Sequence, residues 1–422
     1  MTTIRTVAAA LALGLTARGV AAQQPNASAT AFGMAGNYSA AASGADAVAW
    51  NPAMLGMNSP GFSLRLLSLG VVSGLDPVKY NDITDFGGKV IPNATKEAWL
   101  SKVGAGTERG GVDGGVSIVA LSVGRIGLQV GMSGTAQANL NQDAAEAILY
   151  GNAGRTGTAK NLAFNGSNAG GSAFLTGAAS IAIPLPFTPT GRPGEQMSFG
   201  VTGKYVDGFA VARAQDNGSL VTADNIGVSF PAIYTDSNHV GNSGSGVGVD
   251  LGLAWTDGAT TFGATARNVV NTFAWSTSSL ASTPGTVTFN GTDPSKVTFD
   301  AAPYASAPAA MRAAIEAEKF KPEIAVGVAH RMDKLTLTAD GSTRIGDGIE
   351  IGPKMHVGVG AELRVIPLLP LRAGVAAITD GFQLAGGAGL HLGPFELGVA
   401  GSMRSKSKGT DYGVMVSLIS IH

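Results

Sequence analysis

Apolar and polar residues alternate along most of this chain, in segments that run for about ten residues. In 354–366, Met355, Val357, Val359, Ala361, Leu363 and Val365 alternate with Lys354, His356, Gly358, Gly360, Glu362 and Arg364. A period of two predicts a β-strand with one apolar face and one polar or glycine face. Strands of soluble sandwiches usually stop after about five or six residues, whereas a bilayer-spanning strand needs roughly 9–11 with its apolar face outward. The pattern therefore favours a transmembrane β-barrel.

Fourteen such segments are separated by turns rich in Gly, Pro, Asn and Asp, and we expect each to be a strand. They are Gly61–Val72, Val112–Ser122, Arg125–Ala138, Ser172–Ile183, Gln196–Arg213, Gly246–Trp255, Thr260–Phe273, Lys321–Arg331, Lys334–Thr343, Lys354–Ile366, Leu369–Thr379, Gly381–Leu392, Pro394–Arg404 and Asp411–Ile421. In the segment 354–366 we expect Met355, Val357, Val359, Leu363 and Val365 to face lipid, and Lys354, Glu362 and Arg364 to face inward.

Long and short connections alternate between these segments. The long ones are Ser73–Gly111, Asn139–Gly171, Ala214–Ser245 and Ala274–Phe320. The short ones lie around Gly124, Ile183–Glu195, Thr256–Ala259, Met332–Asp333, Pro367–Leu368 and Gly393. Outer-membrane barrels have short periplasmic turns and long external loops. We therefore predict an all-β, closed antiparallel barrel of about 14 strands over residues 61–422, with both termini periplasmic. A soluble sandwich is the alternative, but nothing in that fold requires the alternation.

The long connections contain segments with helical spacing of apolar residues. We expect short helices at Ala94–Val103, Gln142–Tyr150 and Ala307–Phe320. They are local caps that tighten a loop, or they form an apolar collection surface at the barrel mouth.

The first 22 residues have the layout of a secretory signal peptide. Arg5 precedes an apolar stretch, and Val20-Ala21-Ala22 gives the small-residue ending before a cleavage site. The apolar stretch is too short to cross about 30 Å of hydrocarbon. Removal of residues 1–22 leaves 26 basic against 29 acidic residues, which gives no footprint for nucleic acid. We therefore expect an exported protein located in the bacterial outer membrane.

The composition excludes several kinds of chemistry. The chain has no cysteine, which excludes disulfides and thiol catalysis. Its five histidines lack metal-ligand spacing, and no G-x-S-x-G motif is present. The charges expected in the lumen could form a catalytic dyad, but we expect them to be paired inside the barrel, because an unpaired buried charge is costly. They are Asp250, Glu323, Glu362, Arg364 and Arg372. We expect no enzyme activity, no metal and no cofactor.

Residues 23–60, between the signal and the first strand, are rich in small residues and too apolar for a solvated tail. Pro52 forces Asn51 out of helical geometry and favours a turn there. The segment is an ordinary linker that ends in this turn, or it is a compact plug in the lumen. In a plug, Gly33 and Gly36 would permit close packing against glycines of the wall. Asp46 would then need a donor from the wall, and we expect this donor to be Arg364 or Arg372.

Three motifs in this segment resemble the N-terminal signature of the FadL-like outer-membrane proteins. They are Gly33-Met34-Ala35-Gly36, Asp46-Ala47-Val48 and Asn51-Pro52-Ala53-Met54-Leu55. Leu371-Arg372-Ala373-Gly374 is similar to a late strand of the family. The family includes fatty-acid and aromatic-hydrocarbon channels and the PorV/PorQ-like proteins of type IX secretion. The resemblance implies fourteen strands with the N-terminal segment folded inside as a hatch, in which Gly33, Gly36, Asp46, Asn51, Pro52 and Ala53 form the plug motif.

The chain departs from the family at two places. It ends Ile421-His422 without the usual terminal aromatic residue, and its long loops show no match to the family's entry-groove hairpin. Three functions follow from the pattern and the resemblance. The first is passive uptake of a fatty-acid-like hydrophobic molecule past the plug, with outer-membrane lipid around the barrel. The second is a PorV-like role in binding an exported protein. The third is a purely structural barrel.

Overall fold

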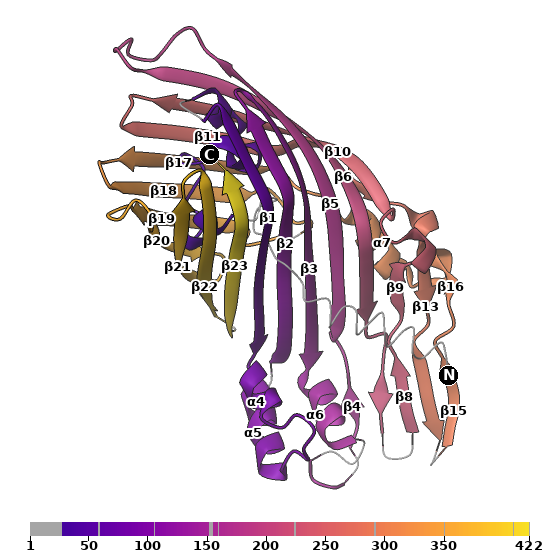
Figure 1. The fold of residues 1–422 in the computed structure, drawn as a ribbon. Coiled ribbons are helices and arrows are strands. Elements are labelled where there is room, and N and C mark those ends of the chain that lie inside the picture. The colour runs from indigo at the N-terminus through magenta and orange to yellow at the C-terminus, as the bar shows by residue number, and fades with distance from the viewer. Residues whose placement is uncertain are drawn as a thin grey trace.

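The computed structural model describes residues 28–57, 60–104, 106–151, 155–158, 160–222, 225–290, 293–349, 351–407 and 409–421. The predicted signal peptide, residues 1–22, lies outside them. Fourteen antiparallel strands form a closed barrel, because each pairs with the next and the last pairs with the first (Figure 1). In chain order they are β1 (Phe62–Asp76), β2 (Thr107–Val123), β3 (Ile126–Asn141), β5 (Asn168–Pro184), β6 (Gln196–Gln215), β10 (Gly244–Thr256), β11 (Thr260–Asn271), β17 (Glu323–Arg331), β18 (Leu335–Arg344), β19 (Met355–Leu363), β20 (Leu371–Ile378), β21 (Gly381–Leu392), β22 (Phe395–Lys406) and β23 (Gly409–Ile421).

All fourteen predicted strands are confirmed, and the sandwich alternative is wrong. Period two decides the faces of β19 as expected, since Met355, Val357, Val359 and Leu363 are exposed and Glu362 is buried. An apolar outer face on a closed barrel suits a bilayer, which cannot satisfy an exposed sheet edge. The side chain of Arg364 is 53% exposed, yet its Nε lies 2.7 Å from the buried carboxylate of Glu362, so its inward direction stays a prediction. β19 ends at Leu363, so the strand no longer fixes the direction of Arg364.

The wall is taller on one side than on the other (Figure 1). Strands β1 to β6 are 15 to 20 residues long, with β4 excepted, whereas β17 to β20 are 8 to 10. The long connections all leave the barrel at one end, which we call the long-loop end. The opposite, short-turn end holds the tight turns together with the start of β1 and the end of β23.

The long connections contain the expected helices α5 (Asn93–Val103), α6 (Gln142–Tyr150) and α7 (Ala309–Ala317), together with α4 (Tyr80–Thr84). No helix among the described residues is long and apolar enough to cross a membrane. The sequence did not predict the short strands of these connections. β9 (Ala232–Thr235), β12 (Ala274–Trp275), β13 (Leu280–Thr283) and β16 (Ala302–Pro303) extend the barrel sheet. β4 (Leu162–Ala163), β7 (Leu220–Val221), β8 (Asn225–Ser229), β14 (Thr286–Asn290) and β15 (Asp293–Thr298) form a separate small sheet.

Candidate functional site

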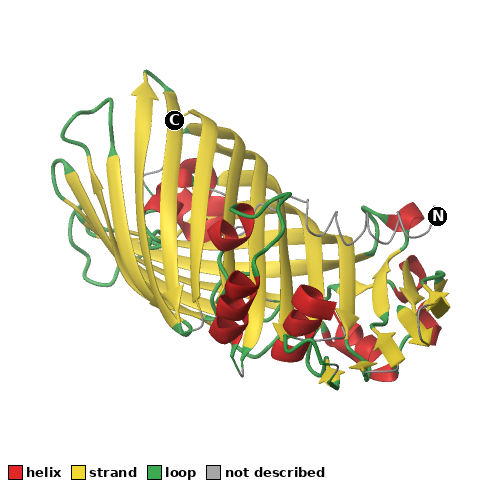
Figure 2. Cartoon of the chain, turned by 90° about the horizontal axis from the view of Figure 1, so that it is seen from below, coloured by secondary structure: helices red, strands yellow, loops and turns green. Residues whose placement is uncertain are grey.

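Residues 28–57, which we call the lumenal segment, lie inside the barrel (Figure 2). The segment holds α2 (Ala29–Gly33), η1 (Gly44–Asp46), α3 (Ala47–Trp50) and η2 (Pro52–Gly56). Helix α2 packs against β20 to β23, η1 against β1 to β3, and η2 against β5, β6 and β10. Most of the segment's contacts fall on wall residues close to the short turns, so the segment fills the short-turn half of the lumen.

Glycines on both sides make this packing possible. A Cβ on Gly33 would lie 3.2 Å from the Cα of Gly387 on β21. A Cβ on Gly374 would overlap the backbone of Met34, so only glycine lets β20 approach the segment there. Gly36 has φ +84°, a left-handed conformation that glycine adopts without strain. The two plug-motif glycines therefore occupy a position of close backbone approach, Gly33, and a position of positive φ, Gly36.

Asn51 caps η2, with Pro52 at the first helical position. Its Oδ1 accepts a hydrogen bond from the Ala53 backbone nitrogen at 3.1 Å, and its Nδ2 donates to the Leu253 carbonyl at 3.2 Å. Asn51 is fully buried. The motif residues Asn51, Pro52 and Ala53 thus join the segment to β10.

Asp46 is buried and pairs with Arg65 on β1, with a Nη2–Oδ2 distance of 2.9 Å. It also accepts hydrogen bonds from the hydroxyls of Ser28 and Tyr38. The expectation that Asp46 binds Arg364 or Arg372 is therefore wrong. The donor is a wall arginine as expected, but η1 packs against β1 to β3, whereas Arg372 lies on β20.

The predicted lumenal charges are paired. Glu362 binds both Arg372 and Arg364 at 2.7 Å, and Arg372 also binds Glu396 on β22 at 2.7 Å. Asp250 and Glu323 do not pair within the predicted set. Their partners are Lys204, at 2.6 Å, and Arg267, at 2.8 Å.

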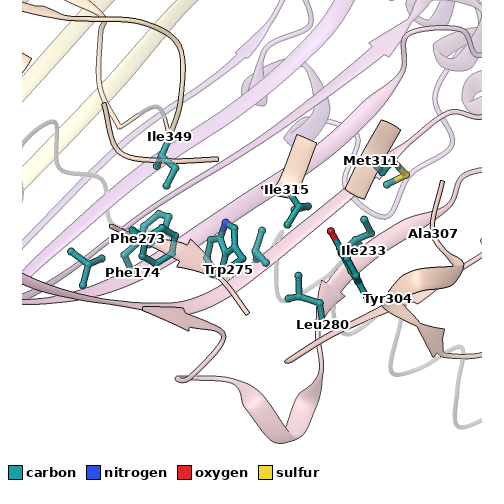
Figure 3. Close-up of a cluster of buried hydrophobic side chains, with 12 residues drawn as sticks. Phe174, Ile233, Phe273, Trp275, Leu280, Tyr304, Ala307, Met311, Ile315 and Ile349 are labelled. Atoms are coloured by element: carbon teal, nitrogen blue, oxygen red, sulfur yellow. The ribbon is translucent and has the colours of Figure 1, made fainter. Parts of the chain in front are cut away.

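An apolar cluster, which we call the mouth cluster, lies at the long-loop end (Figure 3). It joins inward-facing residues of β5 and β6 to α7 and the long connections. Its members are Phe174, Val206, Val211, Ile233, Phe273, Trp275, Leu280, Tyr304, Ala307, Met311, Ile315 and Ile349. The sequence analysis offered an apolar surface at the mouth as one alternative for the helix at Ala307–Phe320, and it missed the other members, most of which come from connections without a strong period.

Aromatic rings form the centre of the mouth cluster. Phe174 and Phe273 meet edge to face with centroids 5.4 Å apart, and Trp275 lies 5.1 Å from Phe273. Trp275 Nε1 donates to Glu318 at 2.7 Å, and Arg213 pairs with the same carboxylate. Burial and a hydrogen bond to Glu316 raise the pKa of Tyr304 to about 12. The polar tips are thus satisfied while the rings pack on one another in a buried apolar cluster.

No protein-family model matches the chain, and no curated protein matches it by sequence. Its structure is similar to the toluene transporter TbuX of Ralstonia pickettii, with a TM-score of 0.52 and 12% identity over 94% of this chain and 99% of that chain. The toluene transporter TodX of Pseudomonas putida gives a TM-score of 0.52 and 12% identity over 95% and 98%. The monoaromatic hydrocarbon channel CymD gives 0.52 and 13% over 94% and 96%. The chain has the fold of the FadL-like barrels.

Two small cavities border the lumenal segment of this FadL-like barrel. One, of about 30 Å³, lies between the segment and β11 to β19, where Trp50, Asp340 and His356 line it. The other, of about 10 Å³, lies beside Val48. A water needs about 10–15 Å³ and a drug-sized ligand roughly 300–1,000 Å³. These cavities therefore accept water and exclude a ligand while the segment stays in place.

Ile351 connects the two halves of the FadL-like lumen. It packs against the mouth cluster and also lines the larger cavity beside the lumenal segment. Ile349, two residues earlier, is itself a member of the cluster and is held by a backbone hydrogen bond to Lys319. The connection 345–354 between β18 and β19 thus touches both the apolar mouth and the polar interior.

Proposed function

We propose that this protein is an outer-membrane channel for the passive uptake of hydrophobic small molecules. The observation that carries the proposal is the mouth cluster on the inner wall of a closed barrel, between the long loops and the lumenal segment. The long loops face the exterior and both termini the periplasm, and outer-membrane lipid surrounds the barrel. A hydrophobic molecule that enters between the buried side chains of the mouth cluster is removed from water, which is favourable by about 0.8 kcal/mol for each buried CH₂ group.

Passage then requires the lumenal segment to act as a movable plug. The bordering cavities of about 30 and 10 Å³ are too small for the cargo. The part of the segment after Asp46 is bonded to the wall by Asn51 Nδ2 to the carbonyl of Leu253 and by the hydroxyl of Thr202 to the carbonyl of Val48. Individual hydrogen bonds contribute only about 0.5–1.5 kcal/mol each. A local shift of the segment is therefore affordable without unfolding of the wall.

The structural neighbours support this class of cargo. TbuX and TodX are toluene transporters and CymD is a monoaromatic hydrocarbon channel. The proposal here is the wider class of hydrophobic small molecules, with a fatty-acid-like chain as one member.

The test is uptake of a hydrophobic fluorescent dye into liposomes that contain the purified protein. Trp275→Ala should slow uptake several-fold, because it opens the ring cluster. The matched control is Trp255→Ala. Trp255 stacks with Phe262 beside the short turn between β10 and β11, at the end of the barrel opposite the mouth cluster. Equal uptake by the parent protein and by empty liposomes would refute the proposal.

A second candidate function is a PorV-like role in binding an exported protein. The filled short-turn half of the lumen favours it, as do apolar side chains exposed on the long loops, such as Val90 at 92% and Ile148 at 69%. Under this alternative, the purified barrel alone does not move the dye, and substitution of Val90 and Ile148 by serine abolishes capture of the exported partner.

A further inference from the structure

The first and last strands of the barrel meet in an irregular seam. Strands β23, β1 and β2 each carry one residue, at the same level, that the flanking strands β22 and β3 do not match, since the register shifts between Glu396 and Gly398 in the β22–β23 ladder and between Ser117 and Val119 in the β2–β3 ladder. β1 stays in register with both β23 and β2 from Leu66 to Ser68. The extra residues are Leu418, Leu67 and Ile118, and all three are exposed. Leu67 has φ +48°, a left-handed conformation that a leucine adopts only at a cost. The row of extra residues thus crosses the closing pair of strands, β1 and β23.

The extra residues change which side chains face the lumen. In a regular strand, residues three positions apart point to opposite faces. Here Arg65 and Ser68 on β1 are both buried, and so are Ser417 and Ser420 on β23. These residues bond across the seam, Arg65 Nε to Ser420 Oγ at 3.1 Å and Ser68 Oγ to Ser417 Oγ at 3.0 Å. The disturbance therefore aims four polar groups inward at the closing pair of strands.

The lumenal segment binds these groups from inside. The backbone nitrogen of Ala29 donates to Ser417 Oγ on β23 at 3.0 Å. Asp46 pairs with Arg65 on β1. The hydroxyl of Ser28 donates to Asp46 at 3.1 Å, so the two attachment points are also joined to each other. A continuous series of polar contacts thus runs from β23 through the segment to β1.

An apolar contact reinforces the same seam. Phe32 of α2 packs in a buried cluster with Val72 of β1, Ala400 of β22 and Met415 of β23. One aromatic ring therefore covers three neighbouring strands at the closure.

We propose that the lumenal segment has a second function, as the brace that holds the closing seam between β1 and β23. The row of extra residues interrupts the β1–β23 pairing between Leu66 and Ser68, and the segment supplies bonds from inside at this level. This role does not depend on what passes through the barrel. It predicts that residues 28–46 keep their place on the seam when the lumen opens.

The first experiment measures the temperature at which the full-length barrel loses its resistance to SDS on a gel. Asp46→Ala with Arg65→Ala removes the ion pair without leaving a lone buried charge. The midpoint temperature of the loss of SDS resistance should therefore fall. Because the chain has no cysteine, Ser68→Cys with Ser417→Cys introduces a single disulfide across the seam. This disulfide should raise the midpoint more in the double alanine variant than in the parent.

The control is a disulfide at a matched place away from the seam. Ser180 and Thr202 are buried hydroxyls on β5 and β6, 2.7 Å apart. The pair Ser180→Cys with Thr202→Cys should raise the midpoint equally in both backgrounds. If the two disulfides rescue the double alanine variant equally, the stabilisation is general and the brace is refuted.

A second readout does not require a disulfide to form. A cysteine at position 417 alone should react with a thiol reagent about tenfold or more faster in the double alanine variant, because loss of a charge-assisted bond increases local opening of the seam. A cysteine at position 180 should react at an unchanged rate in the two backgrounds. Equal acceleration at both positions, or none at position 417, would overturn the proposal.

Discussion

The side-chain nitrogen of Asn51 donates a hydrogen bond to the carbonyl oxygen of Leu253 on β10, at 3.2 Å. This bond joins η2, the last turn of the lumenal segment, to β10 of the wall. Pro52 fixes the direction of the chain as η2 begins. Both residues are buried. This end of the segment is therefore the place where a plug can be loosened without disturbing the seam.

Replacement of Asn51 and Pro52 by alanine should increase leak through the barrel and leave it folded. The substitution removes the hydrogen bonds of Asn51 to the Leu253 carbonyl and to the Ala53 backbone nitrogen, which contribute about 0.5–1.5 kcal/mol each, whereas the fourteen-strand wall is untouched. Single-channel recordings in planar bilayers give the leak. Asn139→Ala is the control, because Asn139 bonds to Asn168 on the wall and not to the segment. Unchanged leak and unchanged dye uptake would mean that the motif is only a turn.

A side chain at Gly374 should displace the segment. Its Cβ would overlap the backbone of Met34, so Gly374→Val forces β20 and the segment apart. Gly177→Val on β5 is the matched control, since nothing lies within 4 Å of a Cβ there. We expect a higher leak for the first variant only. An equal leak from both would place the barrier elsewhere in the lumen.

Two arginines at the same corner should differ widely in their effect on stability. Arg372 is buried between Glu362 and Glu396, and its loss leaves two carboxylates without their shared cation. Breaking such a buried pair costs roughly 3–5 kcal/mol. Arg364 is exposed, and exposed pairs contribute about 0–1 kcal/mol. Thermal unfolding of Arg372→Ala and Arg364→Ala measures the difference, and similar midpoints would contradict this network.

Trypsin added to intact cells tests the orientation of the barrel. Lys89 is exposed in the connection between β1 and β2, and Arg125 is exposed in the short turn between β2 and β3. If the long loops are external, cleavage occurs after Lys89 and spares Arg125. In broken cells both sites are accessible. Cleavage at Arg125 alone in intact cells would reverse the topology.

The wall could be predicted from the sequence because lipid outside and a packed lumen inside impose period two on every strand, as in 355–363. The donor to Asp46 could not, because period two over 62–66 puts Arg65 on the lumenal face with Ser63 but does not say which strands η1 contacts. Strand register would have identified the partner of Glu323, since Arg267 is directly opposite. The partner of Asp250 is diagonal, with Lys204 opposite Gly248. The mouth cluster depends on the folding of the long loops, which no simple periodicity encodes.

The most direct test of the central claim is to lock the lumenal segment to the wall and measure uptake. A Cβ on Gly127 of β3 would meet the Cγ2 of Val48, which lies in residues 47–57, the part of the segment beyond the brace. Val48→Cys with Gly127→Cys should therefore form a single disulfide in a chain that has no other cysteine. We predict that the oxidised protein in liposomes takes up the hydrophobic dye no faster than empty liposomes, and that a reducing agent restores the rate, while the parent protein does not respond to it. Equal uptake by the oxidised and reduced protein would contradict passage past a movable plug.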